Sequence, residues 1–168
     1  MTAWESALAS LAVASGHPEL VDAPWLPTGM SNGGQMSYGL NALRPERVIG
    51  FSANKGGFYN SDRPSLLALA TPVILRAGGG ETDTQLRREN IRSLFDLHRP
   101  RGARWAWVEE ENSPHEIGDS MELILPFLAE VATTRYPAES SSLDGSPALL
   151  PLAESTGWLA ATESFRNG

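Results

Sequence analysis

The chain contains no cysteine among its 168 residues. This absence excludes disulfide scaffolds, thiolate zinc sites and cysteine nucleophiles, so a nucleophile has to be serine, threonine, aspartate, lysine or a similar group. Positive charge is also scarce, because 13 Lys and Arg face 20 Asp and Glu, for a net charge of −7. Nucleic acids and anionic membranes are bound by basic surfaces, and we therefore expect neither as a partner.

Long apolar runs are missing as well. No stretch approaches the roughly 20 apolar residues that cross a bilayer. The first 20 residues lack the cationic segment and the cleavage motif of a secretory signal peptide. The sequence therefore predicts a soluble protein. Its compartment stays unknown, since freedom from cysteine is compatible with both oxidising and reducing surroundings.

The composition that remains is that of a globular protein. Hydrophobic residues make up 41% of the chain and charged residues 20%, and the length suits one domain. We expect that domain over residues 1–136. Residues 137–168, rich in Ser, Pro, Ala and Glu, are expected to form a poorly defined tail with at most a weak late helix.

The hydrophobic pattern predicts an α/β fold. Helical spacing occurs in residues 4–14, 36–43, 86–97 and 120–132, and short apolar runs that indicate strands occupy residues 25–30, 48–51, 73–75 and 103–108. We expect Gly16 to end the first helix and Asp119 to cap the last one. Strands that alternate with helices predict a mainly parallel sheet of about four strands with flanking helices.

Two segments qualify this pattern. Pro27 lies within the first predicted strand, where it cannot donate a backbone hydrogen bond, and it therefore implies an edge, a bulge or a late start of that strand. Residues 52–64 contain turn-forming residues and are expected to be a loop rather than part of the core. In parallel sheets of this kind, functional residues gather at the carboxyl ends of the strands.

A serine motif stands at one such end. The segment Gly29-Met30-Ser31-Asn32-Gly33-Gly34 matches G-x-S-x-G between a predicted strand and a helix. Small residues two positions before and after a nucleophile let neighbouring backbone pass closely in a strained turn. Ser31 is therefore the candidate nucleophile. The N–H of Asn32, at a helix start, could donate to a developing oxyanion.

A serine nucleophile needs a base, and the sequence offers three histidines. His17 lies in a turn beside a proline, which indicates a surface or capping residue. His98 ends a helix, where a cation suits the helix dipole, so it is also read as structural. His115 follows the last predicted strand, at the same edge of the sheet as Ser31, and is the candidate general base.

The base needs an acid from a loop after an intervening strand. Asp83 follows the strand at residues 73–75, with Glu81 as a nearby competitor. The three glycines at 78–80 could instead cradle a phosphate, but no Lys-Ser or Lys-Thr follows them, which weakens that reading. The predicted triad therefore has the chain order Ser31, Asp83, His115.

These three elements, in this order, resemble the α/β-hydrolase family, and the elbow is most similar to its esterase and polyhydroxybutyrate-depolymerase-like members. The resemblance runs from about residue 8 to about residue 136. It implies a serine hydrolase of carboxylic esters that uses an acyl-enzyme and needs no cofactor or metal. It also implies a small-molecule ester substrate, with the loop over residues 54–59 lining the substrate cleft through Asn54, Lys55 and Tyr59.

The resemblance covers only the C-terminal half of that fold. In the family the nucleophile follows the fifth strand, whereas here one helix and one strand precede Ser31. The absent part includes the loop that supplies a second oxyanion donor, and the first strand is expected to expose an edge. A truncated gene model, a natural fragment and a second chain that pairs with this edge all explain the difference, and we expect truncation.

Other readings stay open beside the hydrolase. A catalytically impaired remnant could serve as a non-catalytic or binding unit. His115, Glu116 and Asp119 could bind a metal, although their irregular spacing speaks against it. Trp105 and Trp107 share a strand face and indicate core packing. The acidic run at 109–111 is read as a solvated edge without a catalytic role.

Overall fold

The computed structural model describes residues 2–60, 64–79, 85–111, 113–139 and 145–153. Its centre is a parallel sheet with the strand order β1-β2-β3-β4, formed by β1 (Thr28–Met30), β2 (Phe51–Asn54), β3 (Val73–Gly78) and β4 (Trp105–Glu110). In the described part of the chain, β2 is the only strand that pairs with β1. The predicted α/β class and four-stranded sheet are confirmed.

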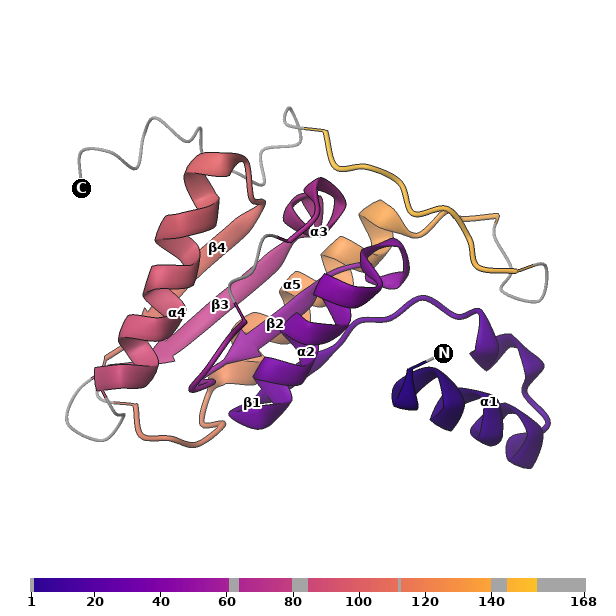
Figure 1. Cartoon of the computed structure of the whole chain (residues 1–168), viewed down its shortest axis with the longest axis horizontal. Helices are drawn as coiled ribbons and strands as arrows, with labels where there is room; N and C mark the ends of the chain where they lie inside the picture. Colours follow the sequence, from indigo (N-terminus) through magenta and orange to yellow (C-terminus); the bar gives the residue numbers. More distant parts are fainter. Residues whose placement is uncertain (1, 61–63, 80–84, 112, 140–144, 154–168) are drawn as a thin grey trace.

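Helices cover both faces of this sheet (Figure 1). The helices α2 (Asn32–Leu43) and α4 (Gln85–His98) lie on one face, and α5 (Ser120–Arg135) lies on the other. The helix α1 (Ala3–Ser15) and the short α3 (Leu66–Ala70) lie outside these two layers. Among the described helices, none combines the length and the apolar character that crossing a bilayer would require.

The first two strands begin later than the sequence predicts. Strand β1 starts at Thr28, directly after Pro27, as a proline at the start of an edge strand allows. Strand β2 was expected over residues 48–51 but spans Phe51–Asn54. Val48 instead forms an isolated bridge with Trp25. The apolar run at 48–51 shows where the chain enters the core, but the residues that pair with β1 and β3 start three positions later, at Phe51.

The expected loop after β2 is wrong in its first half. Residues 52–54 belong to β2, and the whole stretch 51–57 is buried. The turn-forming residues Asn54, Lys55, Gly56 and Gly57 are therefore packed inside the protein. Several of their polar groups form hydrogen bonds with side chains and backbone of other segments, whereas Asn54 Oδ1 has no hydrogen-bond partner among the described residues.

The helix ends are partly as expected. Gly16 caps α1 in the left-handed conformation with φ 73°. Asp119 occupies the position before α5, but its side chain makes no capping hydrogen bond, so the predicted physical reason is wrong. The helix α2 begins at Asn32, four residues before the predicted start. The prediction left out Gly33 and Gly34 because glycine is a poor helix former, but both lie in the first turn of the helix.

The two tryptophans of β4 support the core, as predicted. Trp105 is 1% exposed and belongs to the core with Phe51, Val73 and Leu75, and the partly buried Trp107 packs against it. Part of the expected tail also joins the domain. The N–H of Leu150 donates to the carbonyl of Arg135 at 2.9 Å, and Leu152 is buried.

Candidate functional site

Ser31 lies in a strained turn between β1 and α2. Its backbone has φ 57° and ψ −122°, a conformation that residues other than glycine rarely adopt and that costs about 1–3 kcal/mol. The turn is held on both sides, since the Ser31 N–H donates to the Asn54 carbonyl at 2.8 Å and the Gln35 N–H donates to the Ser31 carbonyl at 3.2 Å. This is the strand-to-helix turn that the serine motif predicts.

The glycines around Ser31 permit close backbone contacts. A Cβ at Gly29 would lie 2.4 Å from the Gly33 carbonyl carbon, and one at Gly34 would lie 2.9 Å from the Asn54 nitrogen. A Cβ at Gly33 would meet nothing within 4 Å. The motif therefore needs small residues at Gly29 and Gly34, whereas Gly33 contributes its backbone and has room for a side chain.

The strain at Ser31 predicts a gain in stability when the side chain is removed. Ser31→Gly should raise the free energy of unfolding by about 1 kcal/mol relative to Ser31→Ala, because glycine adopts this positive φ without a steric penalty. Both variants lack the hydroxyl, so the comparison isolates the backbone. Chemical denaturation of the two proteins measures the difference. A glycine variant no more stable than the alanine variant would show that the turn is unstrained.

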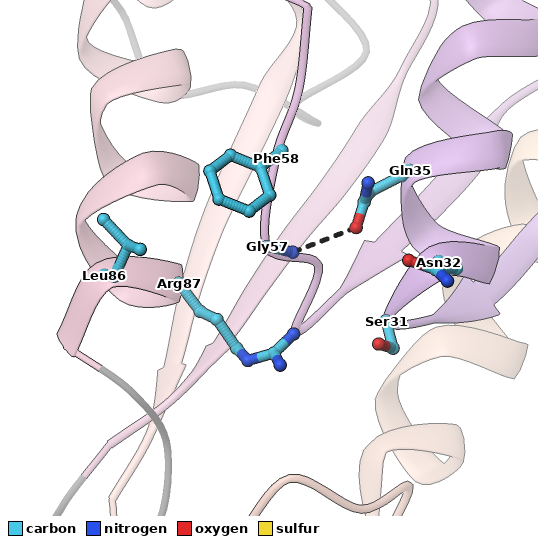
Figure 2. A pocket seen from close by; sticks show the side chains of 7 residues that line it. All are labelled: Ser31, Asn32, Gln35, Gly57, Phe58, Leu86 and Arg87. Carbon is cyan, nitrogen blue, oxygen red and sulfur yellow. Dashed lines mark hydrogen bonds between the residues drawn. The ribbon is translucent and has the colours of Figure 1, made fainter.

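A hollow of about 600 Å³ opens beside Ser31. Its lining consists of Ser31, Asn32, Gln35, Gly57, Phe58, Leu86 and Arg87. Figure 2 shows Ser31 and Asn32 at the start of α2, Phe58 and Leu86 across from them, and the Arg87 side chain extending from α4 towards Ser31. The serine therefore borders a space that combines apolar and polar walls, as small-molecule sites commonly do.

Of the loop over residues 54–59 that is expected at the substrate cleft, Gly57 and Phe58 line this hollow. Asn54 is buried and donates to the Ser120 hydroxyl at 2.9 Å. Lys55 is fully buried, with φ 50°, and its ammonium binds the loop that carries His115. Tyr59 lines a separate hollow of about 200 Å³, and burial raises the pKa of its phenol. None of the three lines the hollow beside Ser31.

His115 is half-buried in the loop between β4 and α5. This loop starts at the carboxyl end of β4, and Ser31 stands at the carboxyl end of β1 in the same parallel sheet. The Glu116 N–H donates to the Pro114 carbonyl at 2.8 Å, which places His115 at the tip of a three-residue turn. Its role as the base of Ser31 stays a prediction. Asp83 and Glu81, the candidate acids, lie outside the described residues.

The acidic run at the end of β4 is not wholly a solvated edge. Glu110 binds Arg76 at 2.5 Å and Lys55 at 3.3 Å, both of which are buried cations. Partial burial opposes ionisation of Glu110, but hydrogen bonds from Ser113 and Lys55 and the charge of Arg76 hold the pKa of this carboxyl below its usual value. The prediction for this residue is therefore wrong: Glu110 is a partner of buried charges beneath the site.

The two remaining histidines, His17 and His98, have contacts that indicate structural roles. His17 is exposed and its Nδ1 lies 2.8 Å from a Glu19 carboxylate oxygen, as expected of a surface histidine. His98 is fully buried against Trp105, with ring centroids 5.2 Å apart. Burial, followed by the charge of Arg101, lowers the pKa of His98. His98 is therefore a core residue and not the exposed helix-end cation that was expected, and its burial disfavours the protonated form.

Within the described ranges, no group of three or more His, Asp or Glu side chains is arranged to hold an ion. His115, Glu116 and Asp119, the three residues with a possible role in metal binding, form no such group.

Sequence reasoning missed three of the seven residues that line the hollow, namely Gln35, Leu86 and Arg87. Gln35 could have been found, because it follows Ser31 by four residues and so shares a helix face with it. Leu86 and Arg87 come from α4, and no local pattern tells which residues of separate segments meet.

Comparisons with known proteins find similarity in structure but no match to a family model or a curated protein. No family model matches the chain, and no curated protein matches it. SOBER1 of Arabidopsis thaliana is similar in structure, with a TM-score of 0.52 and 18% identity over 76% of this chain and 59% of that chain. Esterase PE8 is similar with a TM-score of 0.53 and 23% identity over 76% of this chain and 58% of that chain.

The chain therefore spans less than two thirds of the length of these solved structures, at 59% and 58%. This chain has a parallel sheet with helices on both of its faces. Together with these likenesses, that architecture shows that the chain has an α/β-hydrolase fold over the part that it spans.

Proposed function

We propose that this protein is a serine hydrolase of carboxylic esters that works through a covalent acyl-enzyme. The observation that carries the proposal is the conformation of Ser31, whose φ of 57° is strained for a serine and would be free of strain for a glycine. Strained backbone of this kind concentrates at functional sites. The adjoining hollow and the likeness to an esterase support the same reaction class.

In this mechanism Ser31 Oγ attacks the acyl carbonyl carbon while His115 accepts the hydroxyl proton. Asp83 orients the imidazole and stabilises its protonated form. The carbonyl oxygen becomes an oxyanion, which the Asn32 N–H at the start of α2 can stabilise. The C–O bond of the ester then breaks, and the imidazolium gives its proton to the leaving alcohol.

Water completes the cycle. His115 removes a proton from the water molecule, whose oxygen attacks the acyl-enzyme carbonyl. The bond to Ser31 Oγ breaks, the serine regains its proton from His115, and the carboxylic acid leaves. Phe58 and Leu86, both exposed at the hollow, offer apolar contacts for the acyl or the alcohol group.

Hydrolysis of p-nitrophenyl acetate and butyrate tests the proposal. We expect the wild-type chain to release p-nitrophenol at least about 10³-fold faster than Ser31→Ala, because the variant lacks the nucleophile. Folding of both proteins is compared by circular dichroism. Equal rates for two folded proteins would reject the nucleophile and the acyl-enzyme together.

A second candidate function rests on the length of the match. Because the chain spans 59% and 58% of its structural neighbours and β1 has only β2 as a strand partner in the described part, the protein could be a non-catalytic remnant that binds a partner through this edge. The ester assay decides between the two, since a remnant has no rate above that of Ser31→Ala.

A further inference from the structure

The side chain of Lys55 occupies an unusual place for a lysine. It is the only lysine in the sequence, and it is 0% exposed, although lysine is rarely buried completely. Its backbone has φ 50°, so it is also one of two described non-glycine residues with positive φ, the other being Ser31. Complete burial of a lysine and a positive φ are both unfavourable, so the contacts of this ammonium have to offset their cost.

The Lys55 ammonium holds the turn that carries His115. Its Nζ donates to Ser113 Oγ at 2.5 Å, to the Pro114 carbonyl at 2.7 Å and to the Glu116 carbonyl at 3.1 Å. The last two acceptors lie immediately before and after His115. An ammonium has three N–H donors, and three oxygens of residues 113–116 accept hydrogen bonds from it.

The same short segment also holds Ser31. The carbonyl of Asn54, the residue before Lys55, accepts from the Ser31 N–H at 2.8 Å. The Asn54 side chain donates to Ser120, at the start of α5, at 2.9 Å. Asn54 and Lys55 therefore connect the serine turn with the loop of His115 through direct hydrogen bonds, across the carboxyl end of the sheet.

The charge of Lys55 is balanced beneath the turn. Glu110 Oε2 lies 3.3 Å from Nζ, and Arg76 binds the other oxygen of Glu110 at 2.5 Å. A buried ammonium with these partners keeps its hydrogen bonds directed at the turn. Removing it leaves Glu110 paired with Arg76, so the variant does not strand an isolated buried charge.

We propose that Lys55 is a positioning residue, which sets the place of the His115 imidazole relative to Ser31 and does not contact the substrate. This inference rests on the proposed hydrolase function. A displacement of about 1 Å in a reacting group can cost about 10²-fold in rate. Loss of the three hydrogen bonds therefore acts on turnover and leaves substrate binding unchanged.

The test is the steady-state kinetics of Lys55→Met with p-nitrophenyl butyrate. We expect kcat to fall by about 10²-fold at unchanged KM, as for a group whose effect is confined to the transition state. Arg88→Met is the matched control, since it removes a cation that pairs with the neighbouring Glu109 at an exposed position, at 3.2 Å, and we expect wild-type kinetics. An unchanged kcat, or a raised KM at unchanged kcat, would overturn the proposal.

A milder variant guards against loss of folding. Ser113→Ala removes one of the three acceptors, and we expect kcat to fall by about threefold to tenfold. If Lys55 acts through this turn, a protein that carries both Lys55→Met and Ser113→Ala loses no more activity than Lys55→Met alone. Losses that multiply would show that Lys55 acts elsewhere and would contradict the proposal.

Hydrogen exchange separates this proposal from the hydrolase itself. In Lys55→Met we expect faster amide exchange over residues 113–118, with exchange over β3 unchanged. If the wild type shows no hydrolysis that depends on Ser31, the proposed function fails, and the exchange result alone decides whether Lys55 holds the turn. Unchanged exchange over residues 113–118 would overturn that role.

Discussion

Replacing His115 by glutamine should lower the kcat of ester hydrolysis by about 10³-fold or more. Serine oxygen is a weak nucleophile until a base takes its proton, and glutamine cannot serve as that base. Because Ser31 and His115 act in the same step, Ser31→Ala combined with His115→Gln should be no slower than Ser31→Ala alone. Steady-state kinetics of the three variants measure both effects.

His17→Gln is the matched control for this prediction. His17 is exposed, pairs with Glu19 and does not line the hollow beside Ser31, and we therefore expect wild-type activity. The assignment of the base fails if His115→Gln retains wild-type activity, or if the double variant is much slower than Ser31→Ala.

The second large effect concerns the backbone of the serine turn. Gly29→Ala should lower the free energy of unfolding by about 3 kcal/mol or more, because the new methyl group would lie 2.4 Å from the Gly33 carbonyl carbon, an atom of the backbone that cannot rotate away. Relief of this clash requires β1 and α2 to separate, so activity should fall with stability. Urea denaturation measures the loss.

For Gly33→Ala, two residues after Ser31, we expect no loss in the free energy of unfolding. A Cβ at Gly33 meets nothing within 4 Å, and alanine is the better helix former by about 1 kcal/mol. The variant should be as stable as the wild type or more stable. If Gly29→Ala is no less stable than Gly33→Ala, the close packing of the turn is not what holds Ser31 in place.

Much of the fold could be predicted from the sequence because local patterns carry it. Alternating apolar runs and helical spacings gave four parallel strands with flanking helices, and the left-handed Gly16 marked the end of α1. The register of β2 could not be found in this way. Phe51 is buried and so is Val48, and apolar character alone does not tell which of them pairs with β1 and β3.

Part of the candidate site could also be predicted from the sequence and part could not. The turn at Ser31 follows from a compact motif, since Gly29 and Gly34 are within three residues of it. The place of Lys55 does not, because its partners Ser113, Pro114 and Glu116 lie about sixty residues away along the chain. A lysine among glycines and asparagines indicates an exposed loop, and only the folded arrangement shows that its ammonium is buried.

The central claim is that Ser31 is an activated nucleophile, and a fluorophosphonate probe tests it most directly. Mass spectrometry of the treated protein should find one phosphonyl adduct, on the peptide that contains Ser31, and Ser31→Ala should stay unmodified under the same conditions. Labelling of Ser31→Ala to the extent of the wild type, or no adduct on the folded wild-type chain, would contradict the account.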